Sequence, residues 1–524
     1  MEIGKTIYKL REQSRLSREG FAALFNVSQQ AVQKWESGAA VPTVANLVAI
    51  AKHFNISVDS LLLDEEGSSF DALRLVHEIT PDFGAMDSAE AYYKMLGTEY
   101  EQCFEEGLDI EPYRDLFSAV EKMPDSAAKE KISDVLFGIV SNVGMRADYP
   151  FREPSDLEGI KAERDGYSQG GVVPSDMRGK IAGAWYGRIC GCLLGKPVEG
   201  LRTEALIPLL ELTGNYPMHR YILKSDLTDE ICARFDSGFR TRCWADSISC
   251  APVDDDTNYT VMAQLMIDRC GREFTPENVC NMWVASQSRN AYFTAERIAF
   301  RNIVNGYRPP NTAKYKNPCR EWIGAQIRGD YYGYINPGNP ELAAEMAWRD
   351  ASISHVKNGI YGEMFVAAML SCAACSDDIT GVIRGGLGQI PAGSRLYKAI
   401  TGVIEKFEKG VSAEDCMADI HAEYDEHTAH GWCHTISNAM IVAAALLYGG
   451  GDYGRSVCLA VQTGFDTDCN GATVGSVIGM MKGVKAIGAE WTDPIKGVQD
   501  TSIFGVGKVG IDTLVEKTLK HAGF

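Results

Sequence analysis

The 524-residue sequence lacks any apolar run close to the roughly 20 residues that a membrane-spanning helix requires. Its opening residues, MEIGKTIYKLREQ, carry charges where a secretory signal would have its apolar segment. A disulfide framework is also lacking, because the 15 cysteines are scattered and several lie in apolar stretches such as MLSCAACS, as is typical of free thiols in a reducing compartment. The single CxxC, Cys372 and Cys375, has no second pair and favours core packing over zinc binding. We therefore expect a cytoplasmic protein without membrane contact.

An excess of positive charge is absent as well, since the net charge is −19. This charge is unevenly divided along the chain. Residues 1–62 carry seven Lys and Arg against five Asp and Glu, whereas residues 63–145 carry six against nineteen. So acidic a chain does not attract nucleic acid through its overall field, and any DNA contact must come from the first segment.

The first segment contains two short amphipathic helices joined at the sequence FNVS. Ser17 is placed to cap the first helix, and Ser28 to cap the second. The second helix would expose a polar face made of Gln29, Gln30, Gln33 and Lys34. Glutamines can pair with adenine edges in a major groove, while Lys34 and Arg18 are placed for phosphates. The residues alone equally allow a small helical bundle with a solvated glutamine face.

The stretch LSREGFAALFNVSQQAVQKWESGAAVPTVANLVAIAKHFNISVDSLL resembles the Cro/C1-type (Xre) helix-turn-helix along nearly its whole length. The resemblance rests on Leu16-Ser17, Ala22, Val27-Ser28, Trp35-Glu36-Ser37-Gly38, Pro42 and Ile56-Ser57-Val58-Asp59. It implies a five-helix domain over residues 1–63 that binds a double-stranded DNA operator through residues 1–62 as part of a homodimer. By this resemblance the base-reading side chains are Gln29, Gln30 and Gln33, supported by Ser28, Lys34 and Arg18. Arg18 stands where the family usually has a Gln that contacts a phosphate.

Residues 64–145 hold most of the negative charge and two amphipathic helical stretches, AEAYYKMLGTEYEQCF and AAKEKISDVLFGIVSNV. Pro112 and Pro124 interrupt the pattern between them. We interpret this segment as an acidic helical connector whose charge lies on a solvated surface, with a regulatory or dimer-forming role as the alternative. A stretch rich in Pro, Gly and Asp then leads into a large third domain, residues 146–524.

Two segments of the large domain carry glycines four residues apart. Residues 179–195 have Gly179, Gly183, Gly187, Gly191 and Gly195, and residues 471–483 repeat the spacing with Gly471, Gly475, Gly479 and Gly483. Glycine inside a helix costs roughly 1 kcal/mol relative to alanine. A stripe of small residues compensates by allowing two helices to approach closely. We infer that these helices pack centrally, on each other, and carry Glu199 towards Asp466 and Asp468.

A third acidic group is the run Asp254, Asp255 and Asp256 in PVDDDTNYT. Adjacent carboxylates repel one another unless solvent or a cation screens them. Alone, such a run is more often a helix N-cap, here with Asp256 or Thr257 as the capping residue. Together with Glu199, Asp466 and Asp468 it forms an oxygen-rich set that is suited to Mg²⁺ or Mn²⁺, with enough carboxylates for two ions.

The segments GCLLGKPVEG, VDDDTNYT, WRDASISHVKNGIYG and GFDTDCNGATVGSVIG occur in the order and approximate spacing of the ADP-ribosylglycohydrolase family, which includes the dinitrogenase reductase-activating glycohydrolase. The resemblance covers roughly residues 146–524. It implies an all-α domain that holds two Mg²⁺ or Mn²⁺ ions. In that family the ions grip the ribose hydroxyls of an ADP-ribosyl group while water cleaves the bond at its anomeric carbon.

The resemblance also implies roles for individual residues. Asp255, Asp256 and Asp468 would bind one metal ion, and Asp466 with Asp468 the other, while Asp254 can add a further ligand. Glu199 falls on the family's mobile metal-site glutamate and is our first choice as catalytic base, followed by Asp255. The residues expected to contact the substrate are His355, Tyr361, Gly464 and Phe465.

Three positions depart from the family pattern. Asp254 stands where Thr or Ser is usual and adds negative charge. Cys469 stands where Thr is usual, and a thiol is a poor ligand for a hard ion such as Mg²⁺. Cys192 replaces the aspartate of the usual GDA-type opening. The second metal site is therefore weakened, in a pattern compatible with Mn²⁺ or with a displaced second ion.

The two resemblances together predict a DNA-binding transcriptional regulator whose C-terminal domain hydrolyses an ADP-ribosyl compound, either an ADP-ribosylated protein or a small molecule. One alternative is a domain that only binds ADP-ribose or a related nucleotide as an effector, which the residues at 254 and 469 keep open. In a second alternative the helix-turn-helix serves only for dimerisation. The intact polar face of its second helix argues against that interpretation.

Overall fold

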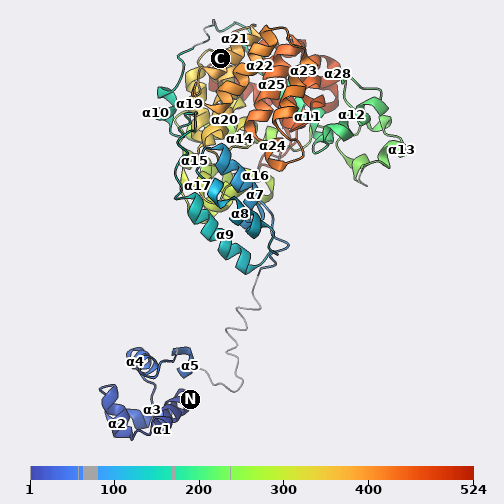
Figure 1. Cartoon of the computed structure of the whole chain (residues 1–524). Coiled ribbons are helices and arrows are strands. Elements are labelled where there is room, and N and C mark those ends of the chain that lie inside the picture. Colours follow the sequence, from blue (N-terminus) through green and yellow to red (C-terminus); the bar gives the residue numbers. More distant parts are fainter. Residues whose placement is uncertain (1, 57, 63–80, 168, 170, 236–237) are drawn as a thin grey trace. The chain divides into compact units, whose positions relative to one another are not determined.

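The computed structural model describes residues 2–56, 58–62, 81–167, 169, 171–235 and 238–524. Ser57 of the helix-turn-helix motif and residues 64–80 of the predicted connector lie outside the described residues. The chain divides into two compact units, Met1–Ala85 and Met86–Phe524 (Figure 1). The division falls at residue 85, so that residues 86–145 belong to the large unit instead of forming a body of their own.

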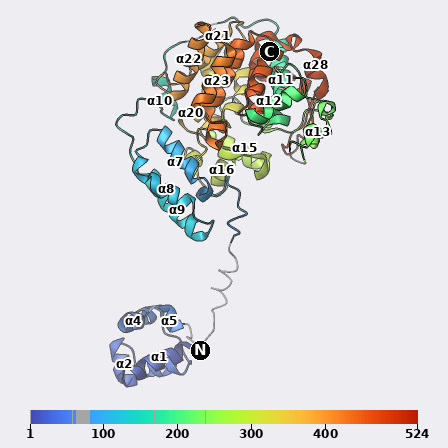
Figure 2. The same cartoon turned by 45° about the vertical axis from the view of Figure 1, so that its right-hand side comes forward.

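Within its described residues, the small unit contains the helices α1 Glu2–Gln13, α2 Arg18–Leu24, α3 Gln29–Glu36, α4 Val44–Phe54 and α5 Val58–Leu62. Figure 2 shows this unit from a second direction. The Ser17 hydroxyl accepts a hydrogen bond from the Gly20 N–H at 3.0 Å, and Ser28 accepts one from Ala31 at 3.1 Å. Both predicted caps are therefore confirmed. A single apolar cluster joins the helices and includes Ile7, Phe21, Val32, Trp35 and Ile50. The predicted five-helix domain is confirmed.

The large unit is built almost entirely from helices (Figure 1). Its first helices are α7 Leu96–Glu105, α8 Arg114–Glu121, α9 Ala127–Val140, α10 Leu157–Ala162, α11 Met177–Gly195, α12 Thr203–Leu212, α13 Asp229–Cys232, α14 Asp255–Cys270, α15 Pro276–Ser286, α16 Thr294–Val304, α17 Asn311–Lys314 and α18 Asp330–Tyr334. The later ones are α19 Pro340–Ala351, α20 Lys357–Ala373, α21 Ile379–Leu387, α22 Arg395–Glu408, α23 Ala413–Glu423, α24 Ala429–Cys433, α25 Thr435–Gly449, α26 Tyr453–Gln462, α27 Thr467–Lys482, α28 Ala489–Thr492 and α29 Ile511–Ala522. Two short strands, β1 Val498–Gln499 and β2 Val509–Gly510, pair antiparallel. The predicted all-α class is confirmed.

The centre of the large unit is formed by helices that are apolar on all sides. Helices α20, α25 and α27 are buried along almost their whole length, as expected for sequences without a polar face. They share one large apolar cluster with α11, α14 and α19. Within the described parts of the chain, no helix combines the length and the apolar character needed to cross a membrane.

The two glycine-rich helices pack directly on each other. A Cβ atom added at Gly187 of α11 would lie 2.1 Å from the carbonyl oxygen of Gly475 in α27, and one added at Gly191 would lie 2.0 Å from that of Gly471. No side chain fits at such distances, so glycine is required on both helices. The prediction that these two segments pack on each other is confirmed. This contact fixes the end of α11 relative to the start of α27.

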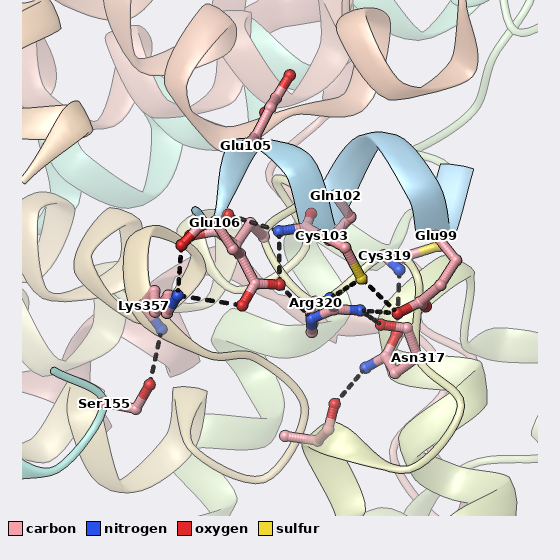
Figure 3. Close-up of polar contacts among 12 residues, drawn as sticks. Glu99, Gln102, Cys103, Glu105, Glu106, Ser155, Asn317, Cys319, Arg320 and Lys357 are labelled. Atoms are coloured by element: carbon pink, nitrogen blue, oxygen red, sulfur yellow. Dashed lines mark hydrogen bonds and ion pairs between the residues drawn. The ribbon is translucent and has the colours of Figure 1, made fainter. Parts of the chain in front are cut away.

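Buried ion pairs attach residues 86–145 to the rest of the large unit (Figure 3). The Arg320 guanidinium donates from Nη1 to Glu99 at 2.9 Å and from Nε to Glu106 at 2.5 Å, both on or next to α7. The Lys357 ammonium lies 3.2 Å from the other oxygen of Glu106. The side chains of Glu99, Glu106 and Arg320 are each less than 9% exposed. Part of the negative charge that we assigned to a solvated surface is therefore buried and paired, which offsets the cost of removing it from water.

Candidate metal centre and nucleic-acid interface

The close contact of α11 and α27 brings the acidic residues near their ends together. A Cβ atom at Gly195, the last residue of α11, would lie 2.3 Å from the backbone of Thr467, the first residue of α27. The Thr467 hydroxyl donates to the Gly195 carbonyl oxygen at 3.0 Å. Glu199, shortly after α11, and Asp466, just before α27, therefore approach each other.

The third acidic segment enters from the start of α14. The Asp254 carboxylate accepts a hydrogen bond from the Asp256 N–H at 2.9 Å and is the N-cap of this helix. The cap is therefore Asp254 and not Asp256 or Thr257, because the helix begins two or three residues earlier than the sequence indicated. The other Asp254 oxygen accepts from the Lys196 ammonium at 2.6 Å. Capping and ion pairing thus occupy both oxygens of Asp254.

Several groups of side chains among the described residues have the spacing of metal ligands, and two of them meet at Asp468. Glu199, Asp466 and Asp468 each offer one carboxylate oxygen, and these oxygens lie within 4.8 Å of one another. Asp256, Asp468 and Cys469 form a second group at the same spacing. Asp468 belongs to both groups, as the resemblance implies for a shared ligand. Asp255 belongs to neither, although it was expected to be a ligand.

The electrostatics of the cluster show that it is short of positive charge. The neighbouring Asp468 charge, followed by burial, raises the pKa of Glu199 to about 9. Burial, followed by the Asp468 charge, raises the pKa of Asp466 well above its ordinary value. Burial and the charges of Asp254 and Asp468 do the same for Asp255. A divalent cation would relieve this repulsion.

The donor set fits a hard divalent cation. Glu199, Asp466 and Asp468 offer carboxylate oxygens, the ligands that Mg²⁺ and Mn²⁺ prefer. In the second group the Asp256 Oδ2 atom is buried and has no hydrogen-bond partner among the described residues. Its other oxygen accepts from Arg188 at 3.0 Å. The first group therefore offers three carboxylates to a cation. The second offers the thiol of Cys469, the shared Asp468 and the Asp256 carboxylate, which is already paired with Arg188.

A cavity of about 540 Å³ opens over the cluster. Its walls include the predicted residues Glu199, Asp254, Asp255, Asp466 and Asp468. Sequence reasoning did not identify the other lining residues that matter here, which are Lys196, Phe293, Glu296 and Trp432. Lys196 could have been found, since it stands three residues before Glu199 in GKPVEG. Nothing in the local sequence marks Phe293 or Trp432, because only the fold brings them to this cavity.

The four residues that were expected to contact substrate do not line the cavity. His355 is 1% exposed, and its ring shares a hydrogen bond with the Ser354 hydroxyl at 2.8 Å. Tyr361 is fully buried and donates its hydroxyl proton to the Pro154 carbonyl oxygen. Gly464 and Phe465 both have positive φ, of 83° and 55°, and form the turn that leads into α27.

The role of this turn is seen in its contacts. The Phe465 carbonyl oxygen accepts a hydrogen bond from Trp432 Nε1 at 2.5 Å. The Asp466 N–H donates to the Asn438 side chain at 3.2 Å. Gly464 and Phe465 are thus absent from the cavity lining, and Phe465 positions Trp432 through its carbonyl oxygen. As substrate contacts they stay predictions, as do His355 and Tyr361.

In the small unit, the predicted reading face of α3 is exposed. Ser28, Gln29, Gln30, Gln33 and Lys34 all lie at the surface, while Val32 and Trp35 on the opposite side are buried. Arg18 is differently placed from expectation, because its Nε donates to Glu36 at 2.7 Å. Glu36 is also paired with Arg11 at 2.6 Å. Arg18 therefore helps to fix α2 against α3, and any phosphate contact would have to use its remaining N–H groups.

Comparison with known proteins agrees with this description. Residues 7–61 match the family described as Helix-turn-helix. A 66-residue stretch is 38% identical to the HTH-type transcriptional activator BcrR of Enterococcus faecalis; it represents 13% of this chain and 32% of that protein. The chain thus spans about a third of the length of this curated relative.

The large unit has its own matches. A solved structure described as an ADP-ribosylglycohydrolase-related protein complex superposes on 67% of this chain and 99% of its own, with 19% identity and a TM-score of 0.43. Residues 173–521, well over half of the chain, match the family described as ADP-ribosylglycohydrolase. The chain therefore belongs to the ADP-ribosylglycohydrolase family and joins a domain of that family to an N-terminal helix-turn-helix domain of the transcription-regulator type.

Proposed function

We propose that the large unit is a metal-dependent hydrolase that cleaves the bond at the anomeric carbon of an ADP-ribosyl compound. The observation that carries this proposal is the group Glu199, Asp466 and Asp468, whose oxygens lie within 4.8 Å of one another in the wall of a cavity of about 540 Å³. A cavity of this volume is within the usual range for small-molecule sites. The membership of the family supports the reaction class.

Glu199, Asp466 and Asp468 would hold a Mg²⁺ or Mn²⁺ ion. When bound, such an ion would orient the ribose hydroxyls and make a coordinated water more acidic. Asp466 and Asp468 are 6% and 3% exposed, so they are fixed ligands shielded from solvent. Glu199 is exposed, and it can therefore exchange a proton with bulk water. This difference supports Glu199 as the general base, with Asp255 as the second candidate.

The rest of the cavity can hold the nucleotide. Cleavage of a ribosyl bond develops positive charge at the anomeric carbon, which nearby carboxylates stabilise. Trp432 and Phe293 provide aromatic surface on which an adenine can stack. The Arg202 guanidinium lies over the Trp432 ring, 4.9 Å from its centroid, at a position where it can also meet a phosphate.

The direct test is release of free ADP-ribose from ADP-ribosylated proteins and small ADP-ribosyl compounds, with Mn²⁺ and with a chelator. We expect turnover only with metal, and a loss of at least 100-fold in Asp468→Asn, which removes the ligand shared by both groups. Asp493→Asn, an exposed carboxylate on the same unit, is the matched control. Equal rates in the three proteins would refute the proposed site.

The alternative is a domain that binds ADP-ribose or a related nucleotide as an effector without turning it over. The thiols of Cys192 and Cys469 among the ligand groups favour it, since thiols are weak ligands for hard ions. Calorimetry with ADP-ribose and Mn²⁺ separates the two functions. Tight binding together with no turnover across a broad panel of substrates would establish the effector.

We also propose that residues 1–62 bind a palindromic operator as part of a homodimer. The exposed polar face of α3 supports this interpretation, and two-fold pairing about one DNA turn apart is the usual route to useful affinity for such a module. Gln29, Gln30 and Gln33 should govern sequence choice, and Lys34 the salt dependence of affinity. Fluorescence anisotropy with the protein's own promoter fragment tests this, since Gln30→Ala should change the preferred sequence and Lys34→Ala only the salt slope.

Occupancy of the cavity should alter DNA binding. Linkage requires that a ligand that changes the affinity for DNA has its own affinity changed by the same factor. The same anisotropy titration, carried out with and without saturating ADP-ribose and Mn²⁺, measures this coupling. Superimposable curves would show that the chain carries two independent functions.

A further inference from the structure

We propose that the acidic centre holds one divalent cation instead of two, because the Lys196 ammonium takes the place of a second cation beside Asp254. This inference deepens the proposed function and depends on its metal site. It rests on how the carboxylates around the cavity are paired with cations of the chain itself. These pairings divide the cluster into two halves.

In the first half, two of the three carboxylates at the start of α14, those of Asp254 and Asp256, are matched by side-chain cations, and Asp255 is not. The Lys196 ammonium donates to Asp254 at 2.6 Å, and the Arg188 guanidinium donates to Asp256 at 3.0 Å. Arg188 and Asp256 are both fully buried, and the Asp254 side chain is 1% exposed. Charges that are paired and this deeply buried do not separate readily, because each would be left without compensation in a medium of low polarity.

Lys196 is held in this position by the fold. It begins the short 3-10 helix Lys196–Val198, directly after the last glycine of α11. Since α11 is locked against α27 at Gly191 and Gly195, the lysine backbone cannot shift without separating the two helices. Its side chain is only 25% exposed and lines the cavity. The ammonium therefore belongs to the cavity wall, where its ion pair with Asp254 holds it.

The remaining ligands on this side do not favour an ion of their own. Cys192 lies within ligand distance of Asp254 and Asp256, and Cys469 within ligand distance of Asp256 and Asp468. Both thiols are buried. A thiol is a poor ligand for a hard divalent cation. A second cation here would find two thiols and two carboxylates that already have cation partners.

The second half of the cluster is different. Among the ion pairs of the described residues, none joins Glu199, Asp466 or Asp468 to a lysine, arginine or histidine within 4.0 Å. Their three oxygens lie within 4.8 Å of one another and face the cavity. This half lacks a cation and has room for one, so a single ion completes the centre.

The test is the metal content of the full-length protein, equilibrated with Mn²⁺ and measured by elemental analysis and by electron paramagnetic resonance. We expect one Mn²⁺ per chain and the spectrum of an isolated ion. Lys196→Met should admit a second Mn²⁺ and produce the spectrum of an exchange-coupled pair. Lys196→Arg, which keeps the charge, should remain at one ion. Circular dichroism verifies that both variants fold.

The outcomes separate this inference from the proposed function. Two ions in the wild-type protein would overturn the inference and leave the metal-dependent hydrolase intact. One ion in both the wild-type protein and folded Lys196→Met would overturn the role of Lys196. No bound Mn²⁺ in the wild-type protein would overturn the metal centre itself, and the inference with it.

Discussion

Two clusters of charged side chains in the large unit differ in whether their carboxylates are paired with cations. Where α7 meets the segment between α17 and α18 and the start of α20, Arg320 and Lys357 are surrounded by Glu99 and Glu106, and both carboxylates have a cation partner (Figure 3). Around the acidic cavity, the carboxylates of Glu199, Asp466 and Asp468 lie next to one another. The first cluster is complete within the chain, whereas the second requires a cation from outside.

This difference separates a structural role from a functional one. Paired charges in a protein interior hold segments in place, here residues 86–145 against the rest of the unit. Unpaired carboxylates with raised pKa values lower stability, and they are retained where they bind or react. The comparison predicts that substitutions in the two clusters will have opposite effects on stability.

Breaking the paired cluster should give the largest effect. Arg320→Met leaves Glu99 and Glu106 buried without their main partner, and we expect the free energy of unfolding to fall by about 3–5 kcal/mol. Urea unfolding followed by tryptophan fluorescence measures it. Arg384→Met, which removes an exposed pair with Glu408, should change stability by less than about 1 kcal/mol. Similar losses in the two variants would show that the buried cluster contributes no more to the free energy of unfolding than an exposed ion pair.

Separating α11 from α27 should disturb the acidic cavity and spare the paired cluster. Gly187→Ala places a methyl group 2.1 Å from the Gly475 carbonyl oxygen, so the helices must move apart, at a cost of about 1–3 kcal/mol or more. We expect weaker Mn²⁺ binding by calorimetry as well, because Glu199 would move away from Asp466. In α22, an added Cβ at Gly402 would meet no atom within 4 Å. Gly402→Ala should therefore stabilise the protein by about 0.5–1 kcal/mol without a change in metal affinity.

Removing a carboxylate from the unpaired cluster should stabilise the metal-free protein. Asp468→Asn relieves repulsion with Asp466 and Glu199, so the melting temperature in the presence of a chelator should rise. In the wild-type protein, Mn²⁺ at 100 times its Kd should add about 2.7 kcal/mol of stability, and this gain should disappear in the variant. Differential scanning fluorimetry with and without Mn²⁺ measures both effects. A lower melting temperature of the metal-free variant would contradict the proposed repulsion.

The comparison also extends to the pH dependence of stability. In the metal-free protein the pKa of Glu199 is raised from 4.5 to about 9, so the folded state binds an extra proton between these values. Its stabilising contribution is complete below pH 4.5 and is lost as the pH rises through about 9. Glu199→Gln should reduce this decline in melting temperature, whereas Glu204→Gln, at an exposed position on α12, should not. An unchanged slope in Glu199→Gln would show that this carboxyl does not titrate abnormally.

Glu105, the last residue of α7 and the neighbour of Glu106 in the sequence, provides the opposite sign. Although burial works against it, His430 and His434 lower the pKa of Glu105 from 4.5 to about 2. The stabilisation from Glu105 is therefore present above pH 4.5 and is lost as the pH falls through about 2. Acid should thus weaken the contact of α7, while alkali should weaken the acidic cavity. Melting curves measured over the whole pH range distinguish the loss of stability in acid from the loss in alkali.

Much of the fold could be predicted because it depends on local patterns. A serine directly before an amphipathic stretch predicts a helix N-cap. Ser17 and Ser28 both stand in this position, and both caps are present. The fourfold glycine spacing predicted a close helix contact, and α11 and α27 make it. Glu199, Asp466 and Asp468 could be grouped from the sequence because each lies at an end of one of these two helices.

Other features could not be predicted, because they depend on which surfaces meet. The acidity of residues 86–145 favoured a solvated segment, yet Glu99 and Glu106 are buried against Arg320, more than 200 positions away in the sequence. The resemblance likewise predicted His355 and Tyr361 as substrate contacts, and the sequence did not show that both side chains are buried and absent from the lining of the acidic cavity. Motif spacing fixes the position of a residue along a helix and not the face that the neighbouring helices will cover.

The sequence by itself determined the helical class, the N-terminal helix-turn-helix domain and the acidic chemistry of the cavity, because periodicity, capping and residue type are properties of short segments. Only the tertiary structure decided how the charges are paired. Whether a carboxylate such as Asp254 meets a lysine, or one such as Asp468 meets other carboxylates, depends on the packing of helices that are distant in the chain. Electrostatic energy in a protein interior depends steeply on separation and burial, and neither quantity is written in the local sequence.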